Sequence, residues 1–148
     1  MGVVTFAAKQ IDMIQRIQSI WLLLASACAF LTLKFSFYSG TYAADNAYHE
    51  INGSENFLLM LTTCLIGTLA LLTIFLYKNR KLQLRLCIGG ILLTALLIVL
   101  YLREMKDFVK GDPNLWALLP AAVIVFFFLA ARGINKDEKM VKDSDRLR

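Results

Sequence analysis

The residues best suited to chemistry gather in the polar stretch 36–56, which contains the only histidine of the chain, His49. Glu50 follows it directly, and Asp45 and Glu55 lie nearby. An imidazole beside carboxylates can transfer protons or bind a metal ion, but a metal site needs three or four converging ligands. The spacing of these residues does not require them to converge. We therefore predict a solvated acidic loop without a metal ion or cofactor.

The three cysteines also lack the surroundings that would make them reactive. They fall in or at the edge of apolar sequence and form no CxxC pair, and Cys28 and Cys64 have no basic partner to favour a thiolate. They are Cys28, Cys64 and Cys87. We interpret them as packing residues.

Polar segments separate four long apolar blocks of the chain, and the elements that these blocks form must position the polar residues. The blocks are residues 17–33, 57–77, 86–102 and 115–131. None contains Asp, Glu, Lys, Arg or His. A helix of roughly 17–25 residues crosses a bilayer, whereas a helix of a soluble protein needs a polar stripe that these blocks lack. The sequence therefore predicts an all-α, integral membrane four-helix bundle, a single membrane domain over residues 1–148. Proton or ion relays usually keep ionisable side chains within the membrane, so their absence argues against one.

The distribution of Lys and Arg predicts the orientation of the helices. The N-terminal segment, the connection 78–85 and the end of the chain carry twelve of these residues, and the two other loops carry four. Because cytoplasmic loops are enriched in Lys and Arg, we expect both termini in the cytoplasm, with 133–148 as a cytoplasmic tail. The net charge of +5 is explained by this pattern, and no recognition motif indicates nucleic-acid binding.

Each apolar block contains one pair of small residues at a spacing of four. Such pairs allow helices to approach closely in lipid, so we expect them at the helix contacts. The pairs are Ala25 and Ala29, Thr63 and Gly67, Gly90 and Thr94, and Ala117 and Ala121.

Both ends of the chain resemble one known family. The run MIQRIQSIWLLLA, residues 13–25, is similar to the opening of DUF4293, a family of unknown function from the Bacteroidota. The segment KDEK at 136–139 and the ending SDRLR at 144–148 resemble the end of that family. Its members typically begin at the methionine of MIQRIQ, so Met13 is an alternative start or the first twelve residues are an addition. The resemblance implies a four-span protein of the bacterial inner membrane with no known activity.

We expect a non-enzymatic membrane subunit or scaffold, embedded in the lipid bilayer, that docks a membrane or cytosolic protein complex through its cytoplasmic ends. The candidate partner-binding residues are Gln15, Arg16, Gln18, Lys136, Asp137, Glu138, Lys139, Asp145, Arg146 and Arg148. Two alternatives remain open at this point. One is a small oligomeric transporter or channel with Ser and Thr lining its path. The other is a membrane-bound enzyme that uses His49 and Glu50 of the outer loop.

Overall fold

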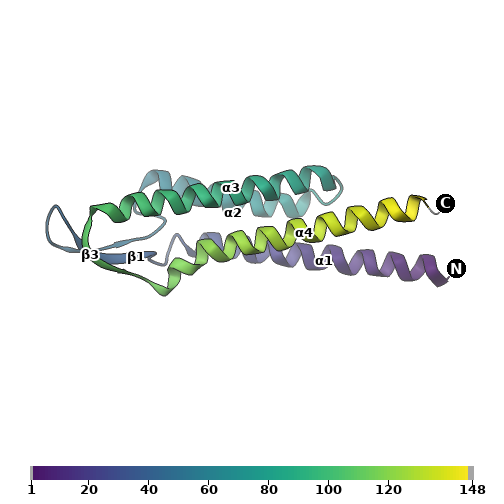
Figure 1. Cartoon of the computed structure of the whole chain (residues 1–148), viewed down its shortest axis with the longest axis horizontal. Coiled ribbons are helices and arrows are strands. Elements are labelled where there is room, and N and C mark those ends of the chain that lie inside the picture. Colours follow the sequence, from purple (N-terminus) through teal and green to yellow (C-terminus); the bar gives the residue numbers. More distant parts are fainter. Residues whose placement is uncertain (1, 147–148) are drawn as a thin grey trace.

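The computed structural model describes the backbone of residues 2–146 and the side chains of residues 17–143, and it consists mainly of four helices (Figure 1). They are α1 (Gly2–Leu31), α2 (Phe57–Phe75), α3 (Arg80–Glu104) and α4 (Leu118–Arg146). Each predicted apolar block lies mostly within one helix, and α1, α3 and α4 are longer than their blocks. Pro120 lies in the first turn of α4, where its missing N–H costs little.

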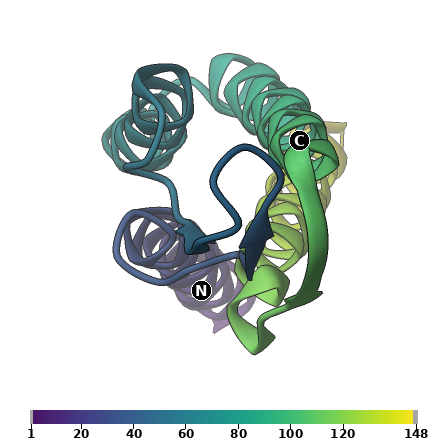
Figure 2. The ribbon, with the colours of Figure 1, turned by 90° about the vertical axis from the view of Figure 1, so that its left-hand side faces the viewer.

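The four helices lie side by side, with α1 against α2 and α4, and α3 against α2 and α4. Figure 2 shows this arrangement from one end. The residues at its centre include Leu22, Ile66, Leu97 and Phe127, each at most 2% exposed. Many other leucines of α2 and α3 face outward, as expected for helices surrounded by lipid. Three of the helices are long and apolar enough to cross a membrane, and the described apolar part of α1, Ile17–Leu31, is shorter.

The prediction of an all-α fold is wrong in one respect, because the two loops at one end form a small sheet. Its strands are β1 (Tyr38–Tyr42), β2 (Tyr48–Ile51) and β3 (Phe108–Pro113). The strand order is β2-β1-β3, and both pairs are antiparallel. Two short 3-10 turns, Met105–Asp107 and Leu115–Ala117, flank β3. The sheet therefore ties the loop before α2 to the loop before α4, at the end of the helices opposite to both termini (Figure 1).

Two glycines make the central pairing of this sheet possible. Gly40 of β1 lies directly opposite Gly111 of β3. A Cβ atom at Gly40 would collide with the backbone of Lys110 and Gly111, and one at Gly111 would lie 2.6 Å from the Ser39 carbonyl oxygen. Neither strand has the long alternation of apolar and polar residues that marks a strand in a sequence. The pairing depends on the helices bringing the two loops together.

The small residues predicted at helix contacts are buried in three of the four helices. In α4 the prediction is wrong, since Ala121 is exposed and the inward face carries Val123, Phe127 and Ala130 instead. Gly67 and Gly90 do not bring two backbones together. Each makes room for a phenylalanine ring, Phe30 at Gly67 and Phe127 at Gly90. In both contacts, therefore, a phenylalanine ring packs on the helix backbone at a position that has no side chain.

Candidate functional site

The end of the molecule that carries both termini is the place where the predicted site residues meet. There α1 and α4 run side by side and extend past the connection between α2 and α3 (Figure 1). The segment 133–148, predicted as a tail, is as far as Arg146 a direct continuation of α4. Part of this segment is packed, because Ile134 is 1% exposed. We call this part of the two helices, from residue 133 of α4 onward with the facing part of α1, the projecting α1–α4 pair, and Ile134 packs its base onto the bundle.

A buried ion pair joins α4 to the connection between α2 and α3. Asp137 is 1% exposed, and its Oδ2 lies 3.3 Å from an Arg80 guanidinium nitrogen. A second Arg80 nitrogen lies 3.4 Å from the Asp137 carbonyl oxygen. One turn further into α3, Gln83 donates a hydrogen bond of 3.2 Å to the Thr73 carbonyl at the end of α2. The Gln83 bond uses a carbonyl in the last turn of α2 and joins α2 to α3, whereas the two Arg80 contacts fix the connection against α4.

Gln18 serves the contact between α1 and α4. Its side chain is 4% exposed and lies over Gly133, where an added Cβ would be 2.9 Å from the Gln18 Cγ. The packing of the Gln18 side chain on α4 at this point therefore depends on glycine. Gln18 and Asp137, both predicted to contact a partner, have their side chains inside the packed helices.

The remaining predicted residues of α4 that the structure describes face outward to different degrees. Lys136 and Lys139 are exposed. Glu138 is half-buried and pairs with Lys142 at 2.9 Å, an interaction that lowers the pKa of the Glu138 carboxyl. The side chains that lie outside the described residues are Gln15, Arg16, Asp145, Arg146 and Arg148.

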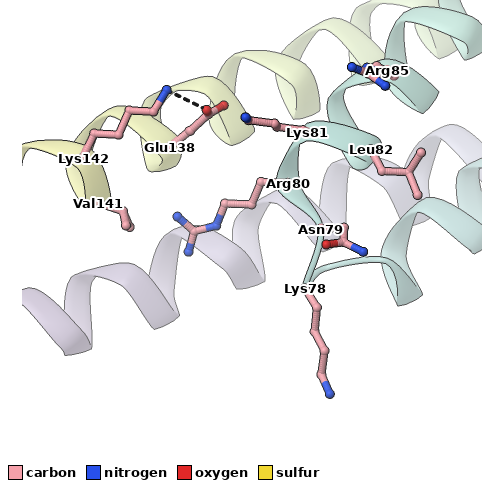
Figure 3. A pocket seen from close by; sticks show the side chains of 9 residues that line it. All are labelled: Lys78, Asn79, Arg80, Lys81, Leu82, Arg85, Glu138, Val141 and Lys142. Carbon is pink, nitrogen blue, oxygen red and sulfur yellow. Dashed lines mark ion pairs between the residues drawn. The ribbon is translucent and has the colours of Figure 1, made fainter. Parts of the chain in front are cut away.

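A basic pocket lies between the connection 78–81 and α4, with a volume of about 620 Å³ (Figure 3). Its lining is Lys78, Asn79, Arg80, Lys81, Leu82, Arg85, Glu138, Val141 and Lys142. Sequence reasoning used these lysines and arginines for orientation only and did not recognise a pocket. The signal was the density of cations in KNRKLQLR, but the contribution of α4 becomes visible only when the helices are packed.

The opposite end holds the residues considered for catalysis or metal binding. His49 Nε2 lies 3.1 Å from Asp45 Oδ2, and this contact, with the Ala47 N–H, lowers the pKa of the Asp45 carboxyl. Both side chains are about half exposed. Glu50 and Glu55 border a small pocket with His49. Among the described residues, no three His, Cys, Asp or Glu side chains are grouped so that they could hold a metal ion.

Several serine and threonine hydroxyls inside the apolar helices form hydrogen bonds within the protein. Thr62, Thr63, Thr73 and Thr94 each donate to the carbonyl four residues earlier, at 2.6–2.7 Å. Ser26 instead donates across the helices, from α1 to the Gly67 carbonyl of α2 at 3.1 Å. These hydroxyls therefore provide helix-internal and helix–helix bonds.

The fold and the outward-facing apolar residues indicate a small helical membrane protein. The chain belongs to the family described as Domain of unknown function (DUF4293), whose model matches residues 14–147. No curated protein and no solved structure matches the chain. The resemblance noted at the two ends of the sequence is thereby confirmed at the level of the family.

Proposed function

We propose that this protein is a four-span, non-enzymatic subunit of the bacterial inner membrane that docks a protein partner through the projecting α1–α4 pair. The observation that carries this proposal is the length of the two terminal helices. Both helices continue beyond the connection of α2 and α3 (Figure 1), and they contact each other along their shared length. A helical backbone in this part of the chain spares a partner the ordering cost that a flexible tail would pay on binding.

The crossing of the membrane by all four helices is supported by their packing. The described apolar part of α1 has fifteen residues, about 22 Å at 1.5 Å per residue. It lies between α2 and α4, and Lys34 beyond its end can extend its side chain towards the headgroups. Both termini lie at one end of the molecule, the end with the larger number of Lys and Arg (Figure 1). The charge distribution supports a cytoplasmic position for that end.

Labelling with a membrane-impermeant maleimide tests this orientation. A cysteine in place of exposed Glu50 is expected to react in intact cells, and one in place of exposed Lys142 only after the cells are opened. The unmodified chain is the control, because Cys28, Cys64 and Cys87 lie within the apolar helices. Labelling of residue 142 from outside intact cells would contradict the orientation.

The partner-binding surface is tested by reversing the exposed charges of α4. Lys136 and Lys139 face solvent, so they can contact an acidic surface on a partner. The double substitution Lys136→Glu and Lys139→Glu is expected to abolish copurification of the partner from membranes in mild detergent. Truncation at residue 133 would be a poorer test, because it also removes buried Ile134 and Asp137.

The matched control carries the same charge reversal at Lys106 and Lys110, exposed residues at the sheet end of the molecule. It should keep the partner, as judged by quantitative mass spectrometry of the purified material. If the protein is recovered alone in its native form, or if both double variants lose the same proteins equally, docking through the projecting α1–α4 pair is wrong.

A further inference from the structure

We infer that the basic pocket and an adjoining leucine groove form one binding site for an anionic phospholipid, with the phosphate in the pocket and an acyl chain in the groove. The inference concerns a lipid bound at a fixed position, beyond the bilayer that surrounds the helices. It does not depend on the protein partner proposed above, because Lys136 and Lys139 do not line this pocket.

The pocket has more positive charge than its own residues neutralise. Of its five cations, Arg80 is paired with Asp137, and Lys142 with Glu138. Lys78, Lys81 and Arg85 have no ion-pair partner among the side chains of residues 17–143. Lys81 extends from α3 towards α4, whereas the end of Lys78 points away from it (Figure 3). Lys81 and Arg85 are thus the groups available to a phosphate.

The groove lies between α2 and α3 and supplies an apolar surface. It has a volume of about 390 Å³ and is lined by leucines and one threonine. The lining residues are Leu65, Thr68, Leu69, Leu72, Leu76, Leu82, Leu86 and Leu93. Leu82 also lines the basic pocket, so the two hollows adjoin at this side chain. A ligand that occupies both must have a charged end and a hydrocarbon end.

The dimensions of the groove fit one leaflet of a membrane. From Leu76 at the pocket end to Leu65, α2 rises by roughly 16 Å at 1.5 Å per residue. This is about half of the ~30 Å hydrocarbon core of a bilayer. The basic residues follow directly on the apolar part of α2 and precede that of α3, which is the level of the lipid headgroups. Basic pockets between membrane helices are known to bind anionic headgroups.

The inference is tested by titrating the purified full-length protein in mild detergent with phosphatidylglycerol or phosphatidylcholine and counting bound lipids by native mass spectrometry. Phosphatidylglycerol is expected to bind more tightly. Replacing Lys81 and Arg85 by glutamine should weaken it at least about tenfold, because each cation near an anionic headgroup contributes about 1 kcal/mol. The matched control, Lys106→Gln with Lys110→Gln, should bind like the unmodified protein. Arg80 is left intact, since it holds Asp137 in place.

Two further arms distinguish a phospholipid from a soluble phosphate. Leu72→Trp, which fills the groove, should weaken phosphatidylglycerol binding more than Leu92→Trp, an exposed leucine of α3 outside the groove. Glycerol 3-phosphate, which has the headgroup phosphate without acyl chains, should not bind in the same concentration range. Equal binding of both lipids, no loss in the Lys81 and Arg85 variant, equal effects of the two tryptophans, or tight binding of glycerol 3-phosphate would each overturn the inference.

Discussion

Replacing Arg80 by alanine is expected to lower the free energy of unfolding by about 3 kcal/mol, because it leaves a buried carboxylate without its cation. Asp137 is 1% exposed, and Arg80 supplies both the ion pair of 3.3 Å and a contact with the Asp137 carbonyl. The Oδ1 atom of Asp137 has no hydrogen-bond partner among the described residues, and Arg80 is its only ion-pair partner among the side chains of residues 17–143. The measurement is thermal or SDS-induced unfolding of the purified protein in detergent.

The second ion pair of α4 provides the control for this prediction. Glu138 and Lys142 pair at 2.9 Å, but Lys142 is largely exposed, and water screens exposed pairs. Alanine at both positions should change the unfolding midpoint little. The double variant Arg80→Ala with Asp137→Ala should be more stable than Arg80→Ala alone, because the uncompensated charge is then absent. A single Arg80 variant as stable as the native protein would show that the buried pair contributes nothing.

The helices were predictable because lipid imposes a simple rule on sequence. A span must be long, apolar and free of charge, and the backbone within it must form its own hydrogen bonds. The block 57–77 therefore corresponds closely to α2 (Phe57–Phe75). The start of α1 and the end of α4 could not be predicted in this way, because both lie outside the apolar blocks. The sequence after residue 131 is charged, yet α4 continues to Arg146, with Ile134 and Asp137 packed against the other helices.

The sheet and the sites depend on contacts between distant parts of the chain, which residue patterns do not reveal. Tyr38 pairs with Pro113 across two intervening helices, and the opposed glycines 40 and 111 carry no side chain that would signal a strand. The cations of KNRKLQLR were evident and supported the predicted orientation. Their place in a pocket depends on α4, and one of them, Arg80, proved to be a partner of Asp137. The sequence predicts Asp137 as a partner-binding residue, because its buried contact with Arg80 forms only when α4 packs against the connection of α2 and α3.

Gly90→Ala is expected to destabilise the protein by about 1–3 kcal/mol, although alanine is the better helix former, because the added methyl group overpacks the helix contact. Its Cβ would lie 2.6–2.9 Å from ring carbons of Phe127, and that ring is fully buried and cannot turn into solvent. The neighbouring glycine is a matched control, since a Cβ at Gly89 has nothing within 4 Å.

Gly89→Ala should therefore leave the unfolding midpoint in detergent unchanged or raise it, while Gly90→Ala lowers it. The smaller side chain of Phe127→Leu should recover part of the loss when it is combined with Gly90→Ala, because it returns the space that the methyl group takes. Equal midpoints for the two alanine variants would mean that Phe127 does not pack on the bare face of α3. If the midpoints of the two variants differ as expected, the Phe127 ring of α4 requires glycine at position 90. The position of this small residue then determines which face of α3 can contact α4.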